Sequence, residues 1–524
     1  MNPLIVGLLK ILRLMVDFVS EIIFFCFHGS TKPLPPLSSP LLLDSATVVA
    51  RKIRERKITS VECVRVVIDR IREIDAILTC VVDSRYEDAI REAGEVDLQL
   101  ASLGPQELEE LKISKPFLGV PFSCKDCFSA KGLSHTAGLY LRKDIKGEYD
   151  APVIERMKNA GGILVCVSNV SEMCMWWEAS NKVTGRTCNP YHTGRTAGGS
   201  SGGEGCLIGA GSTPLGIGSD VGGSIRMPCF FNGIFGHKPS TRIVPNTGGL
   251  PEAHGKHEDY LVTGPMCRNA EDLIPMLSVL AGPEKTRLLR LTDEVKIKNL
   301  KFYFAEDDGG FPLVSPVHPE LKVAQKNFIA GFKREFNIQV EKVKIDELYH
   351  SLGIWMNSMA SEKNRPSFCS DLADNKGAVN PWLEMFKWIL NISKHTLPAL
   401  LLGMSEKMIN TTSKEHLKCV ELGEKLKIKL NELLGENGVL IYPSHSTPAP
   451  YHSQPILKSF NFSYTAVFNI LGVPVTQVPL GVGSWGVPLG VQVVAGLNMD
   501  RNSLAVALEA QRMFGGWFPP APVL

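Results

Sequence analysis

Two serines in a glycine-rich stretch are the residues best suited to covalent chemistry. Residues 196–228 contain eleven glycines among 33 residues, against 47 in the 524 residues of the whole chain. Glycine lets a backbone turn sharply or approach a ligand closely, and the apolar residues between these glycines indicate burial rather than a flexible linker. Ser200 and Ser224 each follow a pair of glycines. We therefore take them as the candidate nucleophiles.

The glycines do not form a phosphate-binding loop. The Walker A pattern needs Gly-Lys-Ser/Thr and the dinucleotide fingerprint needs GxGxxG, and neither occurs within residues 196–228. The GxSxG pattern of a nucleophile elbow is met around Ser200, but an elbow needs a buried strand directly before its serine. Residues 189–197 are turn-like instead. An elbow with Ser200 as nucleophile stays open as an alternative.

Ser224 follows a short apolar strand predicted over residues 214–218 and can open a helix. In the turn between them, the successive N–H groups of Val221, Gly222, Gly223 and Ser224 can point into one concavity. A tetrahedral oxyanion needs such a cluster of donors. Ser224 is then the nucleophile, and its other interpretation is a helix N-cap.

A serine nucleophile needs a base, and no histidine stands near Ser224 in the sequence. Residues 116–128 alternate as a strand does, which places Ser123 and Lys125 on the same face. A lysine on the inner face of an apolar strand is costly unless it is deprotonated or paired. Lys125 is therefore the candidate base, and the alternative is an ordinary surface lysine.

A group of large apolar residues precedes the glycine-rich stretch. Met173, Met175 and Trp177 lie within residues 169–195, a segment that is otherwise polar and rich in turns. Methionine and tryptophan so close to the candidate serines can line an acyl pocket. Ordinary core packing is the other interpretation.

Residues 1–28 predict a membrane-associated helix. The segment is dominated by Leu, Ile, Val and Phe, and its four charges, Lys10, Arg13, Asp17 and Glu21, fall in one narrow stripe at helical spacing. The apolar length is sufficient for a transmembrane helix, and the stripe fits an interfacial helix equally well. A terminal helix that covers a soluble core is the third interpretation.

The rest of the chain predicts one large catalytic domain. Residues 29–40 are a proline-rich linker, and the domain occupies residues 41–524, where helical and strand patterns alternate as in an α/β fold with one central sheet. We expect an amphipathic helix over 265–281. Residues 381–402 predict two short apolar helices with a break at Pro398, which either pack internally or dock on a membrane.

The composition excludes several functions. A formal net charge of +2 with scattered Lys and Arg leaves no basic surface for nucleic acid. Thirteen cysteines without regular spacing argue against a disulfide framework. The one close pair, Cys124 and Cys127, has no second Cys/His pair at ligand spacing, so we expect no metal site.

Three motifs in this chain resemble the signature of the amidase signature family. They are GGSSGG at 198–203, GSDVGGSIRMP at 218–228 and GHKPS at 236–240. The spacing also agrees, since Lys125 and Ser200 precede Ser224 by 99 and 24 residues, as in the family's Ser-cisSer-Lys triad. The resemblance extends from about residue 41 to the C-terminus.

The resemblance implies a fold and a set of roles. The fold would be α/β, with a large mixed central β-sheet covered by helices on both faces. Ser224 would be the nucleophile, Ser200 the bridging serine after a cis peptide bond and Lys125 the general base, with no metal and no cofactor. Asp220 and Arg226 match supporting positions, and residues 221–224 match the oxyanion amides. Two departures from the family pattern, Ala197 and Ser219, touch no catalytic side chain.

The resemblance also implies a substrate class. The apolar N-terminus, residues 172–181 and residues 381–402 are most similar to family members that cleave fatty-acid amides to free acid and amine. We therefore expect a lipid amide substrate, a single N-terminal anchor in an endomembrane or lipid droplet, and no nucleic-acid partner. A homo-oligomer, an amidotransferase subunit or general acylamidase, and a catalytically silent membrane scaffold stay open.

Overall fold

Eleven strands form one mixed sheet in the computed structural model, which describes residues 3–362 and 365–524. The strand order across the sheet is β1-β3-β2-β4-β6-β5-β10-β11-β9-β7-β8. The strands are β1 (Val81–Ser84), β2 (Pro121–Lys125), β3 (Ile163–Ser168), β4 (Leu215–Asp220), β5 (Phe235–Lys238), β6 (Val262–Cys267), β7 (Lys301–Phe304), β8 (Val340–Lys342), β9 (Gly438–Pro443), β10 (Val475–Val482) and β11 (Pro488–Ala495).

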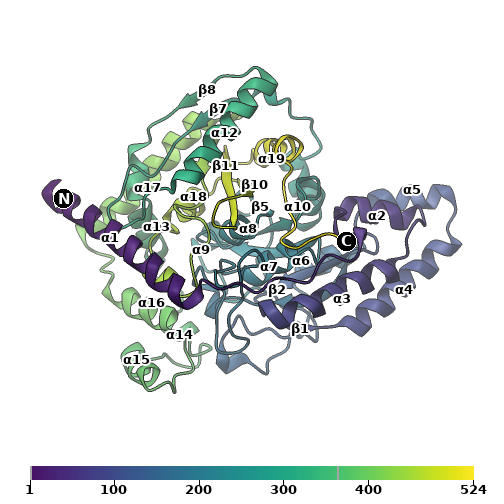
Figure 1. The fold of residues 1–524 in the computed structure, drawn as a ribbon, viewed down its shortest axis with the longest axis horizontal. Coiled ribbons are helices and arrows are strands. Elements are labelled where there is room, and N and C mark those ends of the chain that lie inside the picture. The colour runs from purple at the N-terminus through teal and green to yellow at the C-terminus, as the bar shows by residue number, and fades with distance from the viewer. Residues whose placement is uncertain (1–2, 363–364) are drawn as a thin grey trace.

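Helices surround this sheet (Figure 1). Those of the N-terminal half are α1 (Pro3–His28), α2 (Ala46–Arg54), α3 (Ser60–Leu78), α4 (Tyr86–Ser102), α5 (Pro105–Ser114), α6 (Pro152–Asn159), α7 (Gly202–Gly209), α8 (Arg226–Phe231) and α9 (His257–Tyr260). Those that follow are α10 (Leu273–Ala281), α11 (Pro283–Leu288), α12 (Pro319–Phe336), α13 (Ser351–Ala360), α14 (Phe368–Asp371), α15 (Pro381–Ile389), α16 (Leu397–Met408), α17 (Lys414–Leu434), α18 (Ser463–Leu471) and α19 (Asp500–Phe514).

Both faces of the sheet are covered, and β11 shows why. Successive side chains of a strand point to opposite faces. Val493 enters a core cluster with Leu504 of α19, whereas Val494, the next residue, enters a different cluster with Phe468 of α18. Each face therefore needs its own layer of helices, as the α/β prediction requires.

The directions of the strands next to the candidate serines decide where those serines and Lys125 lie. Strand β2 runs parallel to both β3 and β4, and β4 is paired antiparallel with β6. The carboxyl ends of β2 and β4 consequently lie at the same edge. Lys125 ends the first strand and Asp220 ends the second.

Two of the predicted elements differ from the structure. The helix expected over 265–281 is wrong at its start, because residues up to Cys267 belong to β6 and the α-helix begins only at Leu273. The start of this apolar stretch forms a strand because it pairs with β4 on one side and with β5 on the other. The two apolar helices near 381–402 are present as α15 and α16, but Pro398 stands in the first turn of α16 and does not separate them.

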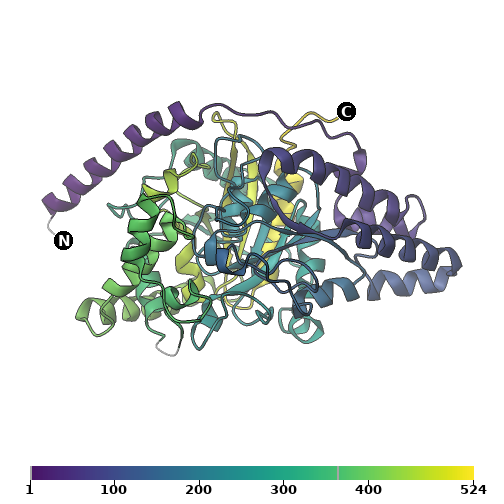
Figure 2. The same cartoon turned by 90° about the horizontal axis from the view of Figure 1, so that it is seen from below.

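The N-terminal helix α1 lies along the outside of the domain (Figure 2). Among the described residues, no helix is long and apolar enough to cross a membrane. Asp17 and Glu21 of the charged stripe of α1 face the protein. Asp17 accepts a hydrogen bond from Ser315 Oγ at 3.0 Å, and Glu21 lies 3.2 Å from Arg195.

The proline-rich segment after α1 is fixed to the domain along its length. Leu34 and Leu37 are buried, and the Leu37 N–H donates to Pro522 O at 2.8 Å, beside the C-terminus. Arg70 Nη1 donates to Pro35 O at 2.8 Å. This segment, predicted as a linker, crosses the surface from α1 toward the C-terminus, as Figures 1 and 2 show.

Candidate active site

Lys125 reaches the site from the carboxyl end of β2. Its side chain is fully buried among the central strands. Its Nζ donates to Ser200 Oγ at 2.7 Å and to Ser219 Oγ at 2.9 Å. The prediction of a lysine held inside the fold thus agrees with the structure. A buried amine is costly unless it is paired or neutral, and the two hydroxyl oxygens supply the pairing.

Ser200 lies in the turn that precedes α7. The Gly199–Ser200 peptide bond is cis, the geometry that the resemblance implies for the bridging serine. A Cβ on Gly199 would stand 2.7 Å from Trp176 O and 2.8 Å from Glu178 N. Only glycine fits there, because the neighbouring backbone approaches too closely for any side chain.

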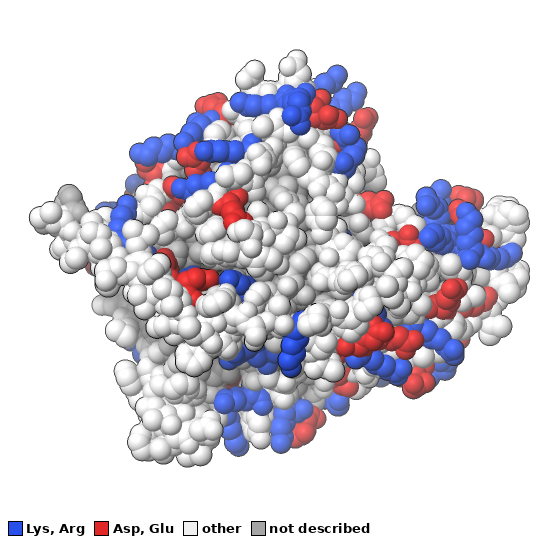
Figure 3. Space-filling model, in the orientation of Figure 1, with Lys and Arg blue, Asp and Glu red and all other residues white. Residues whose placement is uncertain are grey.

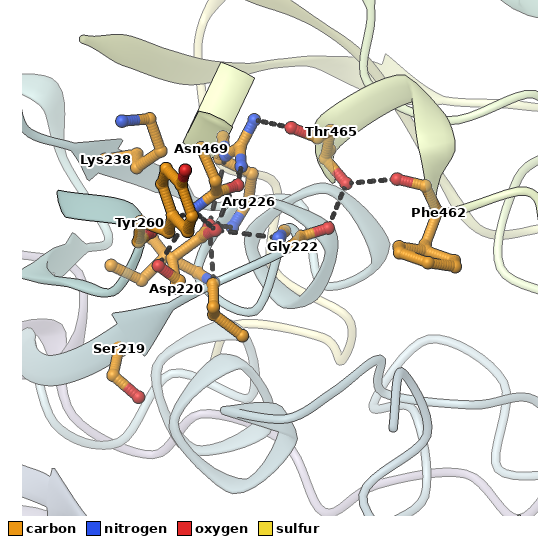
Figure 4. Close-up of polar contacts among 12 residues, drawn as sticks. Ser219, Asp220, Gly222, Arg226, Lys238, Tyr260, Phe462, Thr465 and Asn469 are labelled. Carbon is orange, nitrogen blue, oxygen red and sulfur yellow. Dashed lines mark hydrogen bonds and ion pairs between the residues drawn. The ribbon is translucent and has the colours of Figure 1, made fainter. Parts of the chain in front are cut away.

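Asp220 organises the turn that carries Ser224 (Figure 4). Its carboxylate accepts hydrogen bonds from the Gly223 N–H at 2.7 Å and the Ile225 N–H at 3.1 Å. Arg226 adds Nη2 at 2.9 Å and Nε at 3.0 Å. Burial alone would raise the pKa of Asp220, but the charge and hydrogen bonds of Arg226 outweigh it and hold that pKa well below its usual range.

Two side chains bind the backbone carbonyl groups of the same turn. Trp355 Nε1 donates to Val221 O at 2.8 Å, and Thr465 Oγ1 donates to Gly222 O at 2.7 Å; the Gly222 contact is drawn in Figure 4. Within a peptide unit the C=O and N–H point in opposite directions. The contact from Trp355 therefore orients the N–H of Gly222 away from α13.

The predicted set of oxyanion donors needs one correction. The Gly223 N–H is already bonded to Asp220 at 2.7 Å, so it is not available to an oxyanion. The N–H groups of Val221, Gly222 and Ser224 donate to no acceptor among the described residues. Three of the four predicted amides can thus serve a ligand, while the fourth stabilises the turn.

Ser224 and Ser200 open into one cavity. Both line it, together with Ser219 and Val221, and the Ser201 N–H donates to Ser224 O at 3.3 Å, which joins the two turns. The Ser224 side chain is 7% exposed, and its hydroxyl has no partner among the described residues. The Ser224 hydroxyl therefore opens into the cavity beside the free amide donors, where a substrate carbonyl can reach both.

The apolar wall of the cavity contains Met173 and Met175, as predicted for an acyl pocket. Trp177, predicted with them, lies elsewhere. Its ring packs between Phe231 and His445, and its Nε1 donates to Ser459 O at 3.3 Å. Trp177 is buried in a core cluster with Phe231 rather than in the cavity lining.

Two residues of the site, Ser219 and Cys174, were not predicted from the sequence. The expectation that Ser219 touches no catalytic side chain is wrong, because its Oγ accepts a hydrogen bond from Lys125 Nζ at 2.9 Å. Its position next to Asp220 on β4 was the available signal. Cys174 lines the cavity beside this lysine. Burial raises the pKa of a thiol, but the Cys127 thiol and the charge of Lys125 outweigh it and lower the pKa of Cys174. No spacing in the sequence indicated this contact.

Known proteins resemble this chain over most of its length. The Amidase family model matches residues 62–504. Fatty-acid amide hydrolase 2-A of Danio rerio is 46% identical over 498 residues, which are 94% of this chain and 92% of that protein. Fatty-acid amide hydrolase 2 of Homo sapiens is 43% identical over 495 residues, or 94% and 93% of the two chains.

A solved structure of fatty acid amide hydrolase has the same fold. It superposes with a TM-score of 0.71 over 93% of this chain and 88% of that chain, at 20% sequence identity. The fold and the relatives define a hydrolase that acts on amide bonds. The chain belongs to the amidase signature family.

Proposed function

We propose that this protein hydrolyses fatty-acid amides, either primary fatty amides or N-acylethanolamines, through an acyl-enzyme on Ser224. The observation that carries the proposal is the 2.7 Å hydrogen bond from Lys125 to Ser200, inside a cavity that Ser224 also lines. The relatives named as fatty-acid amide hydrolases, at 43% to 46% identity, support the substrate class.

The reaction begins with proton transfer through the two serines. The reaction needs the unprotonated form of Lys125, which takes a proton from Ser200, while Ser200 takes one from Ser224 and the Ser224 oxygen attacks the amide carbonyl. The amides of Val221, Gly222 and Ser224 donate to the oxyanion. Because these donors are fixed before the substrate arrives, they need no reorganisation as the charge develops.

The tetrahedral intermediate must then lose its amine. An amine anion is too poor a leaving group to depart alone, so the nitrogen needs a proton as the C–N bond breaks. Ser200 delivers that proton and regains one from Lys125. A water molecule next gives a proton to the same relay and attacks the acyl-enzyme, which releases the fatty acid and restores Ser224.

An apolar cavity supports a long acyl chain. Its lining includes Phe128, Met173, Met175, Leu250 and Leu402. Burying each methylene of an acyl chain contributes roughly 0.8 kcal/mol, so such a wall favours fatty amides over short polar ones. A glutamine side chain would gain little from it, which argues against an amidotransferase subunit.

Exposed apolar helices support association with a membrane surface, where such substrates reside. On α15, Trp382, Phe386 and Ile389 are 60% to 68% exposed, and α1 exposes Leu8 and Phe18 to a similar degree. Both helices lie at the same end of the molecule, where Figure 3 shows a surface largely free of charged residues. Apolar patches of this kind mark membrane or protein contacts.

Labelling with a fluorophosphonate tests the mechanism. Mass spectrometry should place the adduct on Ser224, and Ser224→Ala should lose both the adduct and the hydrolysis of oleamide. Ser212→Ala is the matched control, because Ser212 lies in the same glycine-rich stretch outside the cavity lining. An adduct on Ser200 in the wild type would favour the nucleophile elbow. Glutamine hydrolysis without fatty-amide hydrolysis would reject the substrate class, and no hydrolysis across a panel of acyl amides would favour a silent scaffold.

A further inference from the structure

Glu172 joins two walls of the substrate cavity. Its carboxylate is 3% exposed and accepts hydrogen bonds from His395 Nδ1 and from the Thr396 N–H, both at 2.7 Å. Glu172 stands next to Met173 in the chain, whereas Thr396 stands directly before α16. We propose that Glu172 and His395 are positioning residues that set the length of acyl chain the cavity accepts. This inference rests on the proposed fatty-amide hydrolysis.

The near wall of the cavity depends on an unusual backbone. Met173 and Cys174 have φ values of 51° and 56°, a conformation that costs about 1 kcal/mol or more for a residue other than glycine. Only surrounding contacts can maintain it. The Met173 N–H donates to Ala137 O at 2.7 Å and the Cys174 N–H to Ser171 O at 2.9 Å. Glu172 adds a contact to Thr396, directly before α16.

The far wall is α16 itself. Its residues Leu402, Ser405 and Glu406 line the cavity. Thr396 is the N-cap of this helix, and its own side chain makes no capping hydrogen bond. The Glu172 carboxylate accepts the N–H of Thr396 itself and places negative charge at the positive end of the helix. It therefore fixes where α16 begins relative to Met173.

The connection continues beyond α16 to the exposed apolar helix α15. The His395 N–H donates to Ser393 Oγ at 3.1 Å, and Ser393 Oγ donates to Glu384 of α15 at 2.7 Å. One chain of hydrogen bonds thus runs from the α15 surface to the residue before Met173. Loss of Glu172 frees both walls at once, and a long acyl chain, which contacts more of the two walls, loses more affinity than a short one.

Protection against labelling at Ser224 tests this inference, with saturated fatty acids of 8 to 20 carbons as the protecting ligands. In the wild type, protection should increase with chain length. In Glu172→Ala and His395→Ala the long chains should lose about tenfold in apparent affinity and the short chains less than threefold. The rate of labelling without ligand is measured for each variant, and protection by each fatty acid is expressed relative to that rate. Glu172→Gln keeps an acceptor for the Thr396 N–H. It should therefore restore at least half of the lost preference for long chains, measured as the logarithm of the ratio of long-chain to short-chain affinity.

Turnover of primary amides over the same chain lengths should show the same loss in KM rather than in kcat. The exposed Glu415, in the first turn of α17, supplies the control variant Glu415→Ala. Equal losses at every chain length, or an unchanged protection profile in the glutamine and alanine variants, would overturn the inference. If the wild type hydrolyses no fatty amide but protection still depends on Glu172, the proposed function fails and the positioning role stands.

Discussion

Arg226 holds the carboxylate of Asp220 through two nitrogens, at 2.9 and 3.0 Å, and both side chains are fully buried. The same carboxylate binds the N–H groups of Gly223 and Ile225 on either side of Ser224. One buried ion pair therefore determines the shape of the turn that carries Ser224. Removal of this ion pair should lower both the stability of the protein and the rate at which Ser224 is labelled.

Asp220→Asn should destabilise the protein by about 3–5 kcal/mol, because Arg226 would remain as an uncompensated buried charge. Urea unfolding measures this loss, and labelling of Ser224 in the folded fraction should slow by about a hundredfold. Arg512 and Glu335 form an exposed pair at 2.6 Å and supply the control, since Glu335→Gln should leave the unfolding midpoint unchanged. Wild-type stability in Asp220→Asn would show that Arg226 finds other partners.

Cys174 should react with thiol reagents before its neighbour Cys127. The lowered pKa of Cys174 and the raised pKa of Cys127 mean that the first of the two protons leaves Cys174. Alkylation by an apolar maleimide should therefore accelerate as the pH rises from 6 to 8, and it should block the cavity and abolish labelling of Ser224.

Peptide mapping of the alkylated protein identifies the modified cysteine. Cys63 is the internal control, since burial raises its pKa to about 12 and it should stay unmodified. Cys174→Ser should retain activity and resist inactivation. Inactivation of Cys174→Ser at the wild-type rate would assign the effect to another cysteine.

Glu204 should make the wild-type protein less stable as the pH rises. Burial raises the pKa of this carboxyl to about 8, against about 4.5 when exposed. The folded state therefore holds a proton that the unfolded state loses above pH 4.5, so the stabilising effect is complete below that pH and is lost on the way to pH 8.

Glu204→Gln carries no titrating group at this position and still offers an amide to Ser123, whose Oγ donates to Glu204 Oε2 at 2.8 Å. Thermal unfolding of both proteins between pH 5 and pH 8 should show the variant gaining about 1–4 kcal/mol relative to the wild type. A constant difference across this range would mean that Glu204 is ionised in the folded protein.

The charged stripe of α1 should contribute to the stability of the catalytic domain. Glu21 lies 3.2 Å from Arg195 and 3.6 Å from Lys458, and both cations are buried. Glu21→Gln should lower the free energy of unfolding by about 1–2 kcal/mol, less than for a fully buried pair because Glu21 is partly exposed. Removal of residues 1–28 should lower the free energy of unfolding further than Glu21→Gln does.

Unfolding in detergent measures the stability of these variants, and sedimentation with phosphatidylcholine vesicles measures binding separately. Lys10→Gln is the control within the same helix, because Lys10 is exposed. A truncated protein of wild-type stability that no longer binds vesicles would make α1 a membrane anchor alone. Continued binding would assign the membrane contact to α15 and α16.

The candidate site residues could be predicted from the sequence because short local patterns surround them. Paired glycines precede Ser200 and Ser224, and alternation around Lys125 placed an amine on the inner face of a strand. The order of strands and helices likewise predicted an α/β fold. The helix expected over 265–281 failed because an apolar run fits a strand or a helix equally well until its neighbours in the sheet are known.

The tertiary structure decided which of these residues meet. Lys125 and Ser200 are 75 residues apart in the chain and 2.7 Å apart in space. Trp177 packs between Phe231 and His445 rather than in the cavity, and Glu172 has a partner 223 residues away in His395. The sequence by itself determined the reactive groups and the turns that present them. Only the packed sheet and its helices, which bring distant segments within hydrogen-bonding distance, determined that Lys125 contacts Ser200, which amide donors are available and which residues form the walls of the cavity.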